Sequence, residues 1–149
     1  MDFDNLIKSD RLRKEHTSKQ KIAEFLQFAE QEISAAKFNL PKYPLTAYKS
    51  AYDALLHAGN ALIRYYGFRL TPRYTHATIT EFVDRILGKD FGYLVRSFKR
   101  MRRKRHPLQY EAKFSESNKE VKSSILKAES LIEKIEEHMG VGPFQKRLF

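Results

Sequence analysis

The sequence predicts an all-α fold, an antiparallel up-and-down bundle of four main helices plus one or two short ones. Along several long stretches apolar residues recur at spacings of three and four, which is the period of one face of a helix. Most of these stretches begin or end at a capping residue, a glycine or a proline, and no stretch is interpreted as a strand. With 149 residues, 42% of them hydrophobic, the chain can bury a core without disulfides or metal.

The expected helices begin at capping residues and end at glycine or proline. Thr17, with Gln20 three residues later, has the capping-box pattern, and Gly67 suits the position just beyond a helix end. Pro107 is expected to end or kink the fifth helix, because proline lacks the amide donor and clashes with the preceding turn. The expected spans are about 4–13, 17–38, 46–66, 75 or 78 to 87, 90–106, and 115 or 117 to 139.

The helix that Thr46 opens has the clearest apolar seam. Gly59 lies on this seam, and because glycine has no side chain, a neighbouring helix can approach closely there. The last long helix has a second seam with the same spacing. The first seam consists of Tyr48, Tyr52, Leu55, Gly59, Leu62 and Tyr66, and the second of Val121, Ile125, Ala128, Ile132, Ile135 and Met139.

Composition restricts the classes of protein and of site. The chain has no Cys, which excludes a disulfide framework, thiol catalysis and Cys-ligated zinc or iron–sulfur sites. The spacings of its His, Asp and Glu residues are all ones that an ordinary charged helix face would also show, so we expect no metal and no cofactor. No apolar run approaches the ~20 residues of a membrane span and the N-terminus is acidic, so we expect a cytoplasmic protein. Residues 1–139 are expected to form a single domain, followed by a flexible tail over 140–149.

Positive charge is concentrated at one place in the sequence. The formal net charge is +10, and Lys99–Arg105 holds six basic residues in seven positions. A local basic cluster indicates an anionic partner, such as nucleic acid, a nucleotide phosphate or an acidic protein. The alternative is a solvated charged face of a helix.

A helical wheel divides this cluster into two sets. With Phe98 at zero, Arg102 lies at about 40° and Arg105 at about −20°, both inside the apolar stripe. Arg100 and Arg103 lie on the outside, at about 200° and 140°. The outward set, with Lys99 and Lys104, is interpreted as solvated charge that attracts anions.

Two arginines inside an apolar stripe need an explanation, because an unpaired guanidinium in a core costs several kcal/mol. Either the stripe opens into a cleft that holds phosphate, or acidic side chains pair with Arg102 and Arg105. We favour the cleft, because His106 and Tyr110 follow directly and Pro107 opens the backbone between them.

The helix from Thr46 carries a second polar stripe on its outer face. Asp53 can orient His57 through a hydrogen bond between residues four apart, although an ordinary solvent face is the favoured interpretation. His76, at a helix start, is expected to dock the preceding loop. The stripe consists of Asp53, His57, Asn60 and Arg64.

At these residues the chain resembles the HEPN superfamily, whose members are small all-α bundles, usually dimeric and often encoded beside minimal nucleotidyltransferases. The resemblance covers about residues 22–139. It rests on Ala51–Leu62 with Gly67–Arg69, on Thr75–Ile79 and on Arg102–Tyr110.

The resemblance implies a motif of arginine, a polar residue, and histidine after four to six intervening positions. Active HEPN proteins are metal-independent endoribonucleases, in which the arginine stabilises charge on the phosphate and the histidine moves the proton of the 2′-hydroxyl. Counting alone pairs Arg100 with His106. Context instead places Arg105 at the motif arginine, His106 at the polar position and Tyr110 at the histidine. The wheel favours this second register, in which tyrosine, with a pKa near 10, is a poor base.

Three functional hypotheses follow. The first, which we favour, is a nucleotide- or RNA-binding HEPN module that forms a homodimer and works with a nucleotidyltransferase-type partner, as a toxin–antitoxin or regulatory pair. In some relatives the partner adenylylates a tyrosine near the motif, for which the candidate here is Tyr110. The second is an endoribonuclease toxin with Arg102 and Arg105 on the phosphate and His106 as acid and base, and the third is a structural helical adaptor. The candidate catalytic residues are Arg105, His106, Arg102 and Tyr110, the phosphate-binding residues Arg102, Arg105, Lys99, Arg100 and Arg103, and the supporting residues Asp53 and His57.

Overall fold

A computed structural model describes residues 2–111 and 114–141, except for the side chains of residues 106–111. The all-α bundle predicted from the sequence is confirmed: six helices and a small two-stranded sheet make up the described chain. No helix in this part of the chain is both long and apolar enough to cross a membrane. The elements are α1 (Asp4–Lys8), β1 (Leu12–Lys14), α2 (Lys19–Asn39), α3 (Pro44–Tyr65), β2 (Phe68–Leu70), α4 (Thr75–Leu87), α5 (Gly92–Glu111) and α6 (Asn118–Met139).

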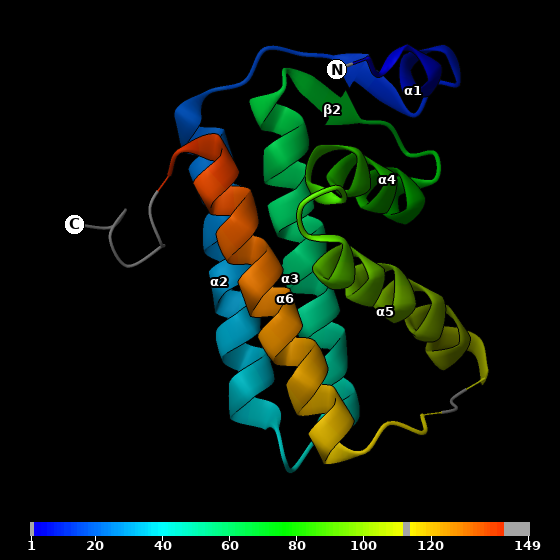
Figure 1. The fold of residues 1–149 in the computed structure, drawn as a ribbon. Helices are drawn as coiled ribbons and strands as arrows, with labels where there is room; N and C mark the ends of the chain where they lie inside the picture. Colours follow the sequence, from blue (N-terminus) through cyan, green and yellow to red (C-terminus); the bar gives the residue numbers. More distant parts are fainter. Residues whose placement is uncertain (1, 112–113, 142–149) are drawn as a thin grey trace.

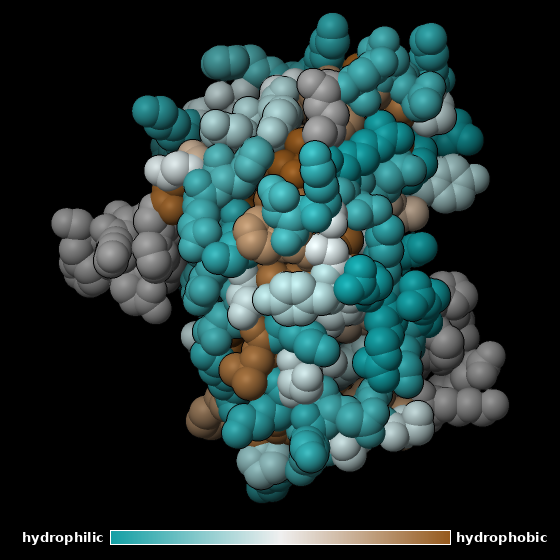
Figure 2. Space-filling view, viewed as in Figure 1, coloured by the Kyte–Doolittle hydropathy of each residue, from teal (hydrophilic) through white to brown (hydrophobic). Residues whose placement is uncertain are grey.

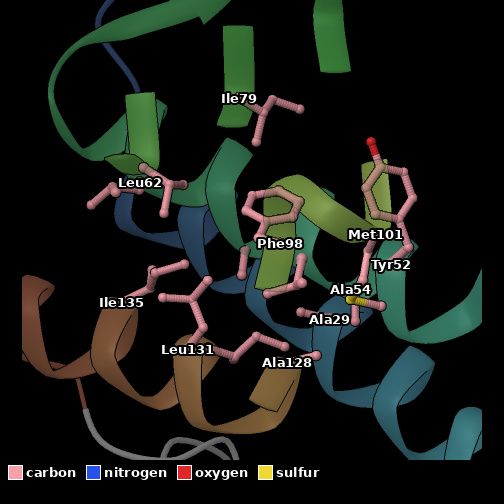
Figure 3. Close-up of a cluster of buried hydrophobic side chains, with 14 of the residues drawn as sticks. Ala29, Tyr52, Ala54, Leu62, Ile79, Phe98, Met101, Ala128, Leu131 and Ile135 are labelled. Carbon is pink, nitrogen blue, oxygen red and sulfur yellow. The ribbon is translucent and has the colours of Figure 1, made fainter. Parts of the chain in front are cut away.

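Helix α3 is the centre of the bundle. In Figure 1, α2 runs opposite to α3 and α6, while α4 and α5 cover the remaining side of α3. The most extensive interface joins α2 to α3, where α3 presents small side chains that let the two helices pack closely. Figure 3 shows the core where these helices meet, with residues of α2, α3, α4, α5 and α6 in one cluster. The buried small side chains of α3 are Ala47, Ala51, Ala54, Ala58 and Ala61.

The expectation of a chain without strands was wrong in one place. Strands β1 and β2 pair antiparallel, with Leu12 opposite Leu70 and Lys14 opposite Phe68. Gly67 has a φ of +85°, which reverses the chain directly after α3 and lets β2 begin at the next residue. Strands of three residues are too short to show a period in the sequence, so only their tertiary pairing reveals them.

The short first helix is also shorter than expected. It ends at Lys8 instead of continuing to about Arg13, because Asp10 has a φ of +57° and turns the chain into β1. Leu12 is fully buried, so this strand contributes to the core although its neighbours Arg13 and Lys14 are exposed.

Most of the other helix ends are close to the predicted positions. The capping box at Ser117 is confirmed, whereas α2 is capped by Ser18, whose hydroxyl accepts from the Lys21 amide at 3.1 Å, instead of by Thr17. Helix α3 begins two residues early, with Pro44 in its first turn, where the missing amide of proline costs nothing.

Pro107 was expected either to end or to kink the helix that contains it, and in the structure it does not end α5. The helical backbone continues through Pro107 to Glu111, because proline removes one amide donor while the surrounding turns keep theirs. The expected tail over 140–149 lies outside the described residues from residue 142 onward.

Gly59 occupies the position where α4 approaches α3. A Cβ built on Gly59 would overlap the Cγ2 of Ile79 and lie 3.3 Å from the Cγ2 of Val83. Both neighbours are buried residues of α4, so neither can move into solvent. The close approach predicted at this glycine is therefore confirmed.

We expect Gly59→Ala to lower the free energy of unfolding by about 1–2 kcal/mol, because overpacking outweighs the gain in helix propensity. Urea denaturation followed by circular dichroism measures the change. Gly92→Ala is the matched control, since its Cβ would meet only the mobile end of the Arg96 side chain, at 3.0 Å. A Gly59→Ala protein as stable as the Gly92→Ala protein would contradict the prediction.

Candidate functional site

The basic run on α5 is divided between the helices on its two flanks. On one flank Lys99 pairs with Asp84 of α4, with 2.5 Å between nitrogen and oxygen. On the other, Arg100 and Lys104 both pair with Glu116, at 2.8 and 2.9 Å. These three side chains remain 39–42% exposed, so their charge is solvated, but it is shared with carboxylates that other segments supply and that a helical wheel cannot show.

Glu116 is a buried carboxylate that the sequence did not single out. Its side chain is 2% exposed, and one carboxylate oxygen pairs with both Arg100 and Lys104 of α5. The other oxygen has no hydrogen-bond partner among the described residues. Burial raises the pKa of the nearby Tyr48 hydroxyl to about 12, against the opposing charge of Arg100. A buried carboxylate held by two cations fixes the segment before α6 against α5, so this cluster is structural.

Arg105 lies against α3, as the wheel predicted. Its side chain is 17% exposed, one guanidinium nitrogen lies 3.5 Å from the carboxylate of Asp53, and its Nε is buried without a partner. The guanidinium also lies 5.5 Å from the centre of the Tyr52 ring, within the range of a cation–π interaction. These contacts hold Arg105 in place without saturating its five donors.

Arg102 lies on the same flank but is exposed, which corrects the expectation that it faces the core. Among the described residues no carboxylate pairs with it. Its charge nevertheless acts on the hydroxyl of Tyr52 and on the imidazole of His76. Arg102 thus has no partner carboxylate in the described part of the chain and lies beside a half-buried cation. The adaptor hypothesis, which needs both arginines paired, has no support from these residues at Arg102.

Tyr52 and His76 join α3 to the start of α4 beside these arginines. The Tyr52 hydroxyl lies 3.1 Å from the Nδ1 of His76, and Figure 3 shows this hydroxyl directed away from the apolar cluster. Burial raises the pKa of Tyr52, so the phenol keeps its proton. Desolvation and then the charge of Arg105 lower the pKa of His76, so the imidazole is neutral near pH 7.

The tautomer of His76 decides what its outer nitrogen offers. When the Tyr52 hydroxyl donates to Nδ1, the ring proton lies on Nε2, which can donate to a phosphate oxygen. When Nδ1 donates to the Tyr52 oxygen, Nε2 carries a lone pair and can accept a proton. His76 is therefore more than a loop-docking residue. Its presence in the segment Thr75–Ile79, which carried part of the HEPN resemblance, was the one indication in the sequence.

The proposed supporting pair of Asp53 and His57 does not meet. Asp53 is directed at Arg105, and the His57 ring packs against Phe28 of α2 with 5.5 Å between ring centres. The outer face of α3 is not a plain solvent face either, because Arg64 is half-buried and pairs with Glu15. Asp53 pairs with Arg105 of α5 instead of forming the hydrogen bond to His57 that the four-residue spacing allows.

His106 and Tyr110 are the two sequence-predicted residues whose side chains lie outside the described part. Their backbone belongs to the last turns of α5, directly beyond Arg105. The two arginines that compete for the motif position are described and lie apart, since Arg100 is directed at Glu116 and Arg105 at Asp53 of α3.

Comparison with known proteins adds one match. A family model with the description HEPN domain matches residues 22–138, a range that contains α3, α4 and α5, nearly all of α2 and α6, and every residue of this site. No curated protein and no solved structure matches the chain.

We expect the pKa of His76 to lie below the ordinary histidine value of 6.5, and an NMR titration of its ring protons measures this pKa. Because the unfolded chain then binds this proton at a higher pH than the folded chain, unfolding becomes easier as the pH falls from 6.5 through the folded pKa. His76→Gln should therefore lose less stability than the wild type between about pH 8 and about pH 5, measured by urea denaturation. Equal losses, or a His76 pKa at or above 6.5, would contradict this.

Proposed function

The chain belongs to the HEPN family, and on this premise we propose that it is a nucleotide- or RNA-binding module that holds phosphate at Arg102 and Arg105. The observation that carries the proposal is the exposed guanidinium of Arg102, which pairs with no described carboxylate, beside the oriented guanidinium of Arg105. Planar guanidinium groups bind two oxygens of one phosphate, and here two of them flank a neutral tyrosine–histidine pair.

The contacts of Arg105 favour a binding role. Asp53 holds only one edge of the guanidinium at 3.5 Å, a longer distance than that of a strong charged hydrogen bond. The Tyr52 ring fixes the orientation of the group without neutralising its charge. A guanidinium oriented in this way loses little side-chain entropy when an anion binds.

The same proposal includes a homodimer and a nucleotidyltransferase-type partner in a toxin–antitoxin or regulatory pair. Two exposed aromatic residues, Tyr65 and Tyr74, support a dimer, while Phe68 packs within the chain against Phe3 and Phe82. Light scattering of the purified chain would contradict the dimer if it gave the mass of one chain. Co-purification with the product of a neighbouring gene tests the partner.

We expect Arg102→Ala/Arg105→Ala to weaken binding of a fluorescent single-stranded RNA by at least about tenfold in an anisotropy titration, because two phosphate contacts are lost. The dependence of the logarithm of affinity on that of salt concentration should fall by about 1.4, or about 0.7 per contact. Lys8→Ala/Lys19→Ala is the control, since it removes the same charge from two exposed residues of α1 and α2.

Two outcomes would overturn the binding site. One is an affinity of the arginine variant equal to that of the lysine control, and the other is RNA binding with no dependence on salt. Arg102→Ala alone separates a loss of binding from a loss of stability, because Arg102 is exposed and pairs with no described carboxylate.

A second candidate function, metal-independent RNA cleavage, is favoured by the position of His76. In its lone-pair tautomer, Nε2 can take the proton of a 2′-hydroxyl while that oxygen attacks the phosphorus and the bond to the 5′-oxygen breaks. The leaving 5′-oxygen takes a proton from water, and Arg102 and Arg105 stabilise the charge on the phosphate. The products are a 2′,3′-cyclic phosphate and a 5′-hydroxyl.

For this candidate we expect the wild type to cut RNA in the presence of EDTA, and His76→Ala to lower the rate by at least about a hundredfold while RNA binding is retained. Gel analysis of end-labelled RNA measures both products. His106→Ala tests the sequence-based hypothesis in parallel, in which His106 is the acid and base. Absence of cleavage by the wild type rejects catalysis and leaves the binding module.

A further inference from the structure

A groove of roughly 530 Å³ runs between α5 and α6, on the flank of α5 opposite to His76. Figure 1 shows the two helices diverging toward the C-terminal end of α5, and Figure 2 shows hydrophilic side chains over this part of the surface. Its volume lies in the range of sites for small ligands. The lining residues are Tyr93, Arg96, Ser97, Arg100, Arg103, Glu120, Ser123, Ser124 and Lys127.

Cations outnumber carboxylates in this groove. Arg96, Arg103 and Lys127 pair with no carboxylate among the residues that the structure describes. The single lining carboxylate, Glu120, is already engaged, since one oxygen accepts from the Ser117 amide at 3.1 Å and the other lies 4.0 Å from Arg100. Three cations around one hollow that no described carboxylate neutralises attract an anion.

The uncharged lining residues indicate which anion fits. Ser97, Ser123 and Ser124 bring three hydroxyl groups to the wall, and the other described lining residues are charged or, at Tyr93, aromatic. Hydroxyl and guanidinium donors together suit the oxygens of a phosphate. Tyr93, 59% exposed at the rim, offers a ring on which a nucleobase can stack.

We propose that the groove between α5 and α6 is a second phosphate site, which takes the terminal phosphate of a nucleotide with its base against Tyr93. The phosphate comes either from a free nucleotide or from the 5′ end of an RNA. A neighbouring hollow shares Tyr93, Ser123 and Lys127 with the groove. It adds Lys119 and Lys122 beside the apolar Leu94 and Leu126, so positive charge continues along α6 beyond the groove. The site is separate from Arg102 and Arg105, which lie on the other flank and line neither hollow.

Calorimetric titration of the full chain with AMP tests the proposal. Arg96→Ala/Lys127→Ala should weaken AMP binding by about tenfold or more, because each cation gives a charged contact to phosphate. Lys8→Ala/Lys19→Ala, with the same change in net charge, should bind AMP as the wild type does. Because the proposed site at Arg102 and Arg105 also takes phosphate, the groove variant and the lysine control are made in the Arg102→Ala/Arg105→Ala background. This background alone should retain AMP binding in the groove, so failure here and failure of the proposed site on the other flank are distinguishable.

Two further titrations identify the source of the phosphate. If RNA is the source, a 5′-phosphorylated oligonucleotide binds more tightly than its 5′-hydroxyl form, and the groove variant abolishes that difference. If a free nucleotide is the source, AMP binds and the two oligonucleotides do not differ. The proposal is overturned if the wild type does not bind AMP, if the groove variant binds AMP as the lysine control does, or if an oligoglutamate peptide binds the groove as tightly as AMP.

Discussion

The burial of α3 is the constraint on which the rest of the structure depends. Eleven of its 22 residues are buried, and they face α2, α4, α5 and α6 in turn. A helix surrounded in this way needs small side chains where neighbours approach, which the row of alanines and Gly59 supply. Because Tyr52 and Asp53 also belong to α3, the residues that meet His76 and Arg105 are held by the core itself.

The basic residues of α5 have different roles, which depend on the residues that lie beside each of them. Toward the segment before α6, buried Glu116 pairs with Arg100 and Lys104, and these ion pairs hold that segment against α5. Toward α3 and α4, Arg105 is oriented by Asp53 and the Tyr52 ring, and Arg102 keeps its charge free. One basic segment thus supplies both structural ion pairs and the cations of the proposed phosphate site, and the difference lies in which carboxylates other elements bring to it.

Much of the fold could be predicted from the sequence, because helix periodicity and caps are local properties. The seams on α3 and α6, the close approach at Gly59 and the capping box at Ser117 all follow from residues near one another in the chain. The β1–β2 pair could not be predicted, since three-residue strands depend on partners more than fifty residues away. The burial of Arg105 followed from its place on the wheel, but the exposure of Arg102 did not, because a wheel does not show how neighbouring helices pack against α5.

The sequence by itself determined the helices, the concentration of positive charge on α5 and the inward direction of Arg105, since each depends on spacing along one helix. Only the tertiary structure decided which of those charges are neutralised, because Asp84, Glu116 and Asp53 come from other elements. It also decided that His76 meets Tyr52. Two residues 24 positions apart come within hydrogen-bond distance only when α4 packs across α3, and no local pattern encodes that approach.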